Sequence, residues 1–392
     1  MKNMHSKIIP YRIKQARVSR GFSMIELASR VGISKQSISQ YEMGTATPSP
    51  LILRNISEVL NYNLSFFTKP MPTTNSSNSA IFFRKKRGTR TKVINAAKEK
   101  IEIFREISDY LSEFVDFPQI NIPTINYNCD YDELLDNETI EEYALMVREK
   151  WGLGYGPIGN LTMELQKNGF FISKMNFGDS KLDAFSVWYN NKPYIFLSND
   201  KPSNARIRFD IAHELGHLLM HANFYTEDEI KASPELYKKI ENEADRFAGA
   251  LLMPNKTFRE DIYSTSIEHF INLKQKWLTS IGSMIYRCET IGILNFSQVK
   301  YLKDQMTARI YWRKEPLDNT IPIETPFALK QAVNLLLDNN IVDTKQIVES
   351  IGCHSSEIEE YCFLQKGTLS FNNYNDTVKL KSSNIIDFND YI

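Results

Sequence analysis

Three of the six histidines in this 392-residue chain lie within nine residues of one another, at His213, His217 and His221. Residues four apart on an α-helix differ in direction by about 40°, so the imidazoles of His213 and His217 share one helix face. Together with Glu214 they form the pattern HExxH, in which two imidazoles hold Zn²⁺ and the carboxylate deprotonates a water molecule that attacks a peptide carbonyl. The sequence therefore predicts a zinc site with His213 and His217 as ligands and Glu214 as the catalytic general base.

A catalytic zinc site needs a third protein ligand, and the sequence offers two sources for it. His221 lies about 80° around the helix from His213 and roughly 12 Å along it, which is too far for both to bind one tetrahedral ion. The acidic helix that begins near Glu241 instead carries inward-facing carboxylates beside Phe247. We predict Glu243 as the third ligand, and the spacing does not exclude Glu241.

A second motif near the amino terminus consists of two short helices joined by a tight turn. Ser23 and Glu26 form a capping-box pattern that begins the first helix, and Gly32 ends it because glycine adopts positive φ without steric cost. Ser34 caps the second helix, whose polar side chains project away from its apolar face. Glutamine and lysine side chains can pair with the base edges of DNA. The candidate DNA-contacting residues are Lys35, Gln36, Ser37 and Gln40.

Charge is distributed unevenly along the chain, although the formal net charge is zero. Residues 1–69 contain ten Lys or Arg against three acidic residues, and residues 84–100 contain eight against one. A basic segment attracts phosphates, whereas the acidic remainder of the chain would be repelled by nucleic acid. Charge alone does not separate a segment that binds double-stranded DNA from two solvated lysine-rich faces. The helix-turn-helix motif in the same segment is what favours double-stranded DNA as a partner.

The length and composition exclude several classes of protein. With 42% hydrophobic and 24% charged residues the chain can form sizeable cores, and it exceeds the roughly 250 to 300 residues at which a single core stops growing. No run approaches the roughly 18 to 20 apolar residues of a membrane helix, and the first residues show no signal peptide. We expect a cytoplasmic protein of several domains without a membrane partner.

The amino-terminal motif resembles the phage-repressor (Xre) type of helix-turn-helix domain over about residues 8–67. The resemblance is carried by Leu27-Ala28, Val31-Gly32-Ile33-Ser34, Gln36, Ile38-Ser39 and Tyr41-Glu42-Met43-Gly44. It implies that Lys35, Gln36 and Gln40 meet base edges of an operator, with Ser37 at a neighbouring contact position. Proteins of this class usually read paired half-sites as dimers, so the resemblance is compatible with a homodimer, although the sequence does not determine the oligomeric state.

The HExxH region resembles the ImmA/IrrE family of metallopeptidases over about residues 140–330. The resemblance is carried by residues 206–217, by Glu243-Ala244-Asp245-Arg246-Phe247-Ala248 and by Leu251-Leu252-Met253-Pro254. It implies that His213, His217 and Glu243 bind zinc and that Glu214 is the general base. Asp245 lies where a carboxylate could orient one of the imidazoles.

The remaining elements follow from periodicity. Apolar residues recur at helical spacing over 91–117, 137–151 and 161–168, and β-branched and aromatic runs at 170–172 and 193–197 predict strands. We predict an all-α helix-turn-helix domain, then an α+β zincin-like peptidase domain and a helical C-terminal region. The expected boundaries are 1–69 for the helix-turn-helix domain, 70–80 for a linker, 81–135 for a basic strand and long helix, 136–265 for the peptidase domain and 266–392 for the helical C-terminal region.

These features together predict a DNA-binding transcriptional regulator fused to a zinc-dependent endopeptidase that cleaves a repressor protein. The sequence leaves open whether the cleaved bond lies in a separate repressor or in this chain's own segment at residues 70–90. Two alternatives belong to other classes. The zinc domain could sense a metal or small ligand without hydrolysing peptide bonds, or it could be an antitoxin-like docking module. Mutation of Glu214 separates the first alternative from hydrolysis, because only hydrolysis needs the general base.

Overall fold

The computed structural model describes residues 7–71, 82–85, 91–125, 135–177, 182–199 and 203–370. Its first part is a small helical domain. The helices are α1 (Pro10–Ser19), α2 (Met24–Val31), α3 (Lys35–Met43) and α4 (Pro50–Leu60), followed by the 3₁₀ turn η1 (Leu64–Thr68). The predicted capping box is present, since Ser23 and Glu26 exchange side-chain and backbone hydrogen bonds, and Gly32 ends α2 at φ 78°.

A four-stranded mixed sheet forms the centre of the larger part of the molecule. Its strands are β1 (Phe82–Lys85), β2 (Phe171–Met175), β3 (Leu182–Tyr189) and β4 (Lys192–Ser198), in the spatial order β1-β3-β4-β2. β2 pairs with β4 in parallel, whereas β1 with β3 and β3 with β4 are antiparallel. The sequence patterns predicted β2 and β4 but not β3.

The β3–β4 hairpin closes through Asn190 and Asn191, at φ 47° and 61°. Asparagine tolerates this left-handed conformation, and two such residues in succession suit the turn that joins tightly twisted hairpin strands. An asparagine pair between aromatic runs was therefore an available signal for a hairpin.

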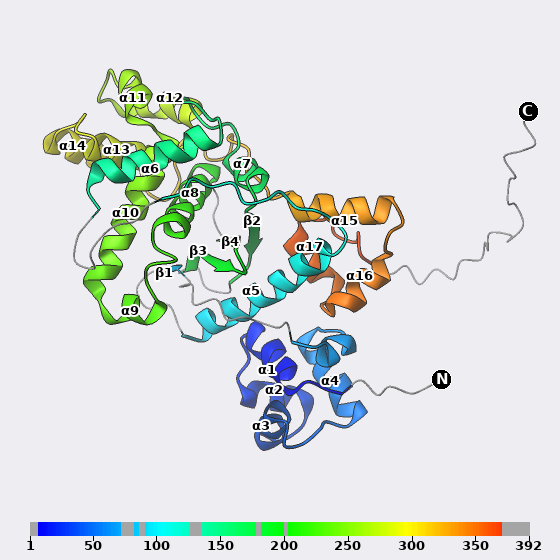
Figure 1. Cartoon of the computed structure of the whole chain (residues 1–392). Coiled ribbons are helices and arrows are strands. Elements are labelled where there is room, and N and C mark those ends of the chain that lie inside the picture. The colour runs from blue at the N-terminus through cyan, green and yellow to red at the C-terminus, as the bar shows by residue number, and fades with distance from the viewer. Residues whose placement is uncertain are drawn as a thin grey trace, which may run out of the picture.

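Helices cover both faces of the sheet (Figure 1). α8 (Asn204–Met220) and α10 (Pro234–Leu252) lie on one face, where the core includes Ile172, Ala184 and Ile195. α5 (Thr91–Ser112) lies on the other face, and the ring of its Phe104 packs edge-on against Phe196 at 5.2 Å. Successive strand residues thus supply two different cores, as the alternation of side chains in a strand requires.

Further helices extend each of the two cores. On the α8 side these are α6 (Asn137–Lys150), α7 (Leu161–Lys167), α9 (Glu227–Ala232), α11 (Asn255–Phe258), the 3₁₀ turn η2 (Arg259–Asp261), α12 (Ile267–Trp277), α13 (Ile281–Thr290) and α14 (Phe296–Ala308). On the α5 side they are α15 (Ala328–Asp338), α16 (Thr344–Ile351) and α17 (Ser355–Cys362). The helices predicted over 91–117, 137–151 and 161–168 are confirmed as α5, α6 and α7.

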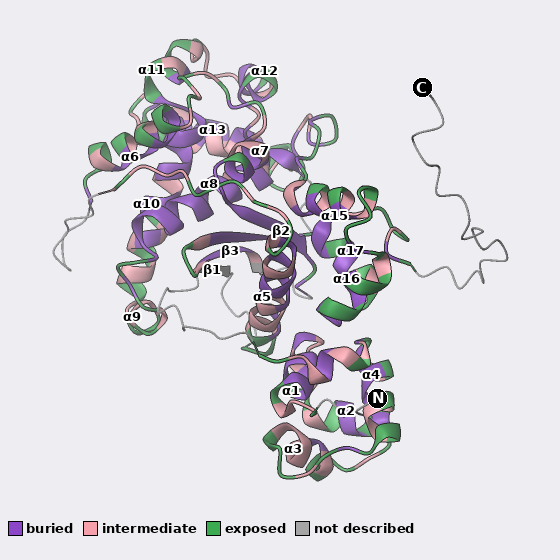
Figure 2. Ribbon diagram, turned by 45° about the vertical axis from the view of Figure 1, so that its right-hand side comes forward, coloured by how far each residue is buried: buried purple, intermediate pink, exposed green. Residues whose placement is uncertain are grey.

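The helix-turn-helix domain packs directly on α5 and on the C-terminal helices. Buried Arg12 of α1 donates to Glu106 of α5 at 2.6 Å, and Arg20 forms two hydrogen bonds with Glu357 of α17, at 2.8 and 2.6 Å. Apolar residues of the small domain belong to the same core as those of α5 and of the C-terminal helices. Figure 2 shows buried residues in the small domain as well as in α5 and α15–α17.

Most of the predicted linker at 70–80, and residues 371–392 of the predicted C-terminal region, lie outside the described residues. The described part of the chain contains no helix with the length and apolar character needed to cross a bilayer. The architecture is therefore multidomain, with a helical amino-terminal domain, an α+β centre and a helical C-terminal region, as the sequence predicted.

Candidate metal centre and DNA-contacting helix

α8 carries His213 and His217 on one face, deep inside the protein. Their exposed fractions are 0% and 1%. The two Nε2 atoms lie 2.9 Å apart, with the rings steeply inclined at 76°. The spacing of four residues therefore brings both imidazoles to a single point, as expected from one helical turn.

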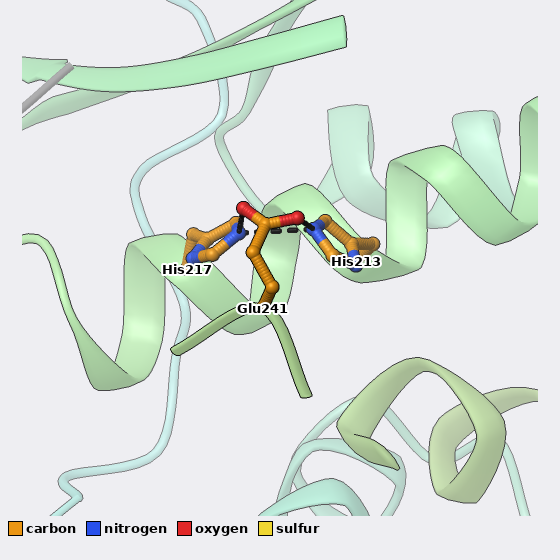
Figure 3. A group of neighbouring side chains, drawn as sticks. All are labelled: His213, His217 and Glu241. Atoms are coloured by element: carbon orange, nitrogen blue, oxygen red, sulfur yellow. Dashed lines mark hydrogen bonds and ion pairs between the residues drawn. The ribbon is translucent and has the colours of Figure 1, made fainter. Parts of the chain in front are cut away.

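Glu241 of α10 completes this group (Figure 3). Its carboxylate oxygens lie 3.6 Å from His213 Nε2 and 3.5 Å from His217 Nε2. Among the described residues, His213, His217 and Glu241 form a set whose potential ligand atoms all lie within 4.8 Å of one another. Two nitrogens and one carboxylate are the ligand types of a catalytic zinc site.

The structure does not bring Glu243, the ligand expected from the sequence, to the two imidazoles. Its Oε2 lies 3.0 Å from Nε2 of His221 instead. Residues two apart on a helix point in directions about 200° apart, so Glu241 and Glu243 cannot face the same pair of rings. The rotational position of α10 thus places Glu241 in the group, which is the alternative that the spacing had left open.

The separations within the group agree with what a tetrahedral ion requires. Ligands held about 2.0 to 2.1 Å from such an ion lie roughly 3.3 to 3.4 Å from one another. The two Nε2 atoms are 2.9 Å apart, Oε2 of Glu241 is 3.6 Å from Nε2 of His213, and Oε1 of Glu241 is 3.5 Å from Nε2 of His217. These residues therefore fit zinc in both ligand type and spacing.

Asp245 orients the imidazole of His213. It lies one turn after Glu241 on α10, and its Oδ1 is 2.7 Å from Nδ1 of His213. A carboxylate accepts this hydrogen bond, which fixes the proton on Nδ1 and leaves the lone pair on Nε2, the atom that faces Glu241. The ring therefore presents its metal-binding atom to the group.

His221 and Glu243 orient the second imidazole in a similar way. Burial lowers the pKa of His221 to about 4, so this ring is neutral near pH 7. Its Nε2 donates to Glu243, and its Nδ1, 3.0 Å from Nδ1 of His217, accepts the proton of that atom. The lone pair of His217 is then also on Nε2. The third histidine of the sequence cluster thus positions a ligand, a role that the spacing alone did not indicate.

Glu214 is fully buried between α8 and β3. The hydroxyl of Ser186 on β3 donates to its Oε2 at 2.7 Å. The indole of Trp188, two residues along the strand, donates to the carbonyl of Leu218 at 3.0 Å. β3 therefore runs along the metal helix and holds the predicted general base in place, although the sequence patterns had not identified this strand.

A cavity of about 340 Å³ adjoins the centre beside Asp245. Carboxylates of Asp183, Asp210 and Glu315 line it together with Arg206. Glu315 is paired with the buried ammonium of Lys274 at 2.7 Å, so its charge is neutralised and the lining as a whole is polar.

The predicted DNA-contacting residues lie on α3. Lys35 and Gln36 are exposed, and Ser37 and Gln40 are partly exposed. The opposite side of α3 buries Ile38 completely. Ser37 already forms hydrogen bonds at the start of the helix, where its hydroxyl and its backbone amide both bond the hydroxyl of Ser34. Gln36 and Gln40 therefore project from the side of α3 opposite Ile38, and Lys35 and Ser37 lie on the two flanks of that side. Lys35 and Gln36 are the most accessible of the four.

The electrostatic expectation for the amino-terminal segment needs a correction. Four of its ten basic residues form ion pairs inside the protein or at its internal interfaces with three carboxylates, because Arg12 and Lys69 share Glu106. Most of their charge is therefore neutralised locally. These pairs are Arg12–Glu106, Arg17–Glu42, Arg20–Glu357 and Lys69–Glu106. The positive charge that this domain offers to phosphates is accordingly smaller than a count along the sequence implies.

Two family models match the chain. Residues 13–67 match the helix-turn-helix family, and residues 165–289 match the IrrE N-terminal-like domain, a peptidase family. The first range contains α2 and α3, and the second contains α8, α10 and all three residues of the candidate metal centre. Both resemblances drawn from the sequence motifs are thus confirmed: the chain joins a helix-turn-helix domain to an ImmA/IrrE-like domain.

Three curated relatives match short stretches of the chain. The uncharacterised prophage-derived helix-turn-helix transcriptional regulator YonR of Bacillus subtilis is 34% identical over 58 residues, which is 15% of this chain and 54% of the relative. Uncharacterised helix-turn-helix transcriptional regulators of Sinorhizobium medicae and Rhizobium meliloti are each 39% identical over 61 residues, 16% of this chain and 44% of each relative. The chain spans about half the length of these relatives.

Proposed function

We propose that the chain is a cytoplasmic DNA-binding transcriptional regulator carrying a zinc-dependent endopeptidase, and that its substrate is a repressor protein. The convergence of His213, His217 and Glu241 with Glu214 on the same helix carries this proposal. The match to a peptidase family over the same residues and the regulator names of the amino-terminal relatives support it.

His213, His217 and Glu241 would hold the zinc ion, with Glu241 in the place that the sequence had suggested for Glu243. When bound, zinc lowers the pKa of a water molecule towards about 7 and polarises the peptide carbonyl. The hydrogen bonds that His213 donates to Asp245 and that His217 donates to His221 keep the Nε2 lone pairs of the two imidazoles directed at the ion.

Glu214 would act as the general base and then as the general acid. Its carboxylate takes a proton from the attacking water, whose oxygen bonds to the carbonyl carbon. As the carbon–nitrogen bond breaks, Glu214 returns the proton to the leaving amine nitrogen. The hydrogen bond from Ser186 holds the carboxylate in the position that both transfers require.

Incubation of the zinc-loaded protein with purified repressor proteins from the same cell tests this function. Products are identified by mass spectrometry. We expect cleavage at a defined peptide bond by the native chain, and none by the Glu214→Gln variant with the same zinc content. Equal cleavage by the variant would contradict the role of Glu214. A variant that regulates transcription normally without cleaving would favour a sensor function.

We also propose that α3 reads a double-stranded operator through Lys35, Gln36, Ser37 and Gln40, with two copies of the chain on paired half-sites. The accessible outer side of α3 supports this reading. Fluorescence anisotropy with a DNA fragment from upstream of the protein's own gene measures binding. Replacement of Lys35 by Ala should weaken it, whereas unchanged affinity would exclude contact by this residue.

A further inference from the structure

The edge of the sheet nearest to Glu214 is covered by a short strand of the chain itself. β1 pairs antiparallel with β3, and Phe82 lies opposite Ser186, the residue whose hydroxyl bonds Glu214. Figure 1 shows β1, β3, β4 and β2 side by side beneath α8 and α10. β1 lies outside residues 165–289, whereas β2, β3 and β4 lie inside this range. Without β1, therefore, β3 would be the outer strand of the family-matched sheet.

An outer strand beside a catalytic carboxylate is a binding surface for an extended peptide. Its unpaired backbone N–H and C=O groups can pair with a peptide, which adds to the sheet as a further strand. The opposite edge is formed by β2, which β4 separates from β3. Among the described strands, the β3 edge is therefore the one that would place a peptide backbone next to the group that contains Glu214.

β1 is short and irregularly paired, so another strand could displace it from the edge of β3. It contains four residues, and its register with β3 shifts between Arg84 and Lys85. A strand this short, with an irregular register, contributes few regular hydrogen bonds and is weakly held compared with a strand of ordinary length. The segment is also basic in sequence, with Arg84, Lys85, Lys86 and Arg87 in succession, whereas β3, with which it pairs, carries the acidic residue Asp183.

We propose that β1 occupies the position of the substrate strand and inhibits the peptidase until it is displaced. This inference rests on the proposed function and deepens it. The substrate would be an extended segment that pairs antiparallel with β3, in the register that β1 uses, and basic residues would favour its binding. Displacement of β1 is then the step that regulates access to Glu214.

Peptide binding tests the proposal without any need for catalysis. The probe is a fluorescein-labelled peptide with the sequence of residues 79–88, and binding is measured by anisotropy on full-length Glu214→Gln protein. A second protein carries Glu214→Gln together with four changes in β1: Phe82 and Arg84 become Gly, and Phe83 and Lys85 become Ser. These changes are chosen to prevent β1 from forming a strand. We expect at least tenfold tighter binding of the probe to this second protein than to the protein with native β1.

Two controls separate strand pairing from other effects. Replacement of Asn75, Ser76, Ser77 and Asn78 by Gly-Ser-Gly-Ser changes an equal length of chain upstream and should leave probe binding weak. A probe with serine at both phenylalanine positions keeps the charge and should bind less well. If circular dichroism shows that the variant with all four β1 residues changed does not fold, the single variant Arg84→Pro takes its place in the assay. Proline removes one backbone hydrogen-bond donor from β1.

The outcomes for this inference and for the proposed function are distinct. Equal probe affinity with and without native β1, or no binding to either, would overturn the inference even if the native chain cleaves a repressor. Tighter binding after loss of β1 supports it even if no hydrolysis is found, in which case only the proposed peptidase function fails.

Discussion

Replacement of Asp245 by Asn is expected to weaken zinc binding without removing a ligand. Oδ1 of Asp245 lies 2.7 Å from Nδ1 of His213, and the Asp245 side chain is 32% exposed. The asparagine oxygen can still accept the hydrogen bond, but the negative charge that makes the imidazole a stronger ligand is lost. Loss of a group that orients a metal ligand lowers metal affinity by about 10- to 100-fold. Because asparagine keeps a hydrogen-bond acceptor, we expect Asp245→Asn to lower zinc affinity by about tenfold.

A tenfold change corresponds to about 1.4 kcal/mol of binding free energy. Competition with a chromophoric chelator at fixed free zinc measures it directly. Asp245→Ala, which removes the acceptor as well, should lie closer to 100-fold. Asp228→Asn is the matched control, since the Asp228 side chain is 98% exposed on α9. Native zinc affinity in both Asp245 variants would refute the argument that this carboxylate orients His213.

Three further predictions concern the amino-terminal domain. Glu42→Ala should lower the free energy of unfolding by about 3 to 5 kcal/mol in urea titrations, because it leaves the guanidinium of Arg17 buried without the partner that it bonds at 2.6 and 2.8 Å; a loss below about 1 kcal/mol would contradict this. Gln36→Ala should cost about 1 to 3 kcal/mol of operator binding in anisotropy titrations and little on unrelated DNA, and an equal loss on both would exclude base reading. The pKa of Glu26 is lowered from 4.5 to about 2, chiefly by the backbone hydrogen bond from Ser23. The ionised Glu26 carboxylate therefore stabilises the folded state above pH 4.5, and this contribution is lost as the pH falls from 4.5 towards 2. Glu26→Gln should reduce the loss of stability between these two pH values. The same loss in the variant and in the native protein would contradict this prediction.

Local sequence patterns predicted the parts of the molecule that depend on neighbouring residues. The capping box of Ser23 and Glu26 and the glycine turn at Gly32 are determined within a few positions, and the structure contains both. The four-residue spacing of His213 and His217 likewise requires only that the segment be helical. These features therefore did not depend on knowledge of tertiary packing.

The features that the sequence did not reveal depend on contacts between distant segments. Whether Glu241 or Glu243 faces the imidazoles depends on how α10 is rotated against α8, and both residues lie on the same acidic helix. The partner of Arg12 is Glu106, 94 positions away, so a charge count by segment could not detect their neutralisation. The sequence patterns do not identify β3, although the Asn190-Asn191 turn that follows it is a local signal for a hairpin.

The zinc content of two glutamate variants tests the central claim most directly. Native protein, Glu241→Gln and Glu243→Gln are equilibrated at the same free zinc, and bound zinc per chain is measured by plasma mass spectrometry. The geometry predicts one zinc in the native chain, marked loss in Glu241→Gln, and retention in Glu243→Gln, whose effect on His217 is indirect. Full zinc in Glu241→Gln together with loss in Glu243→Gln would contradict the proposed centre.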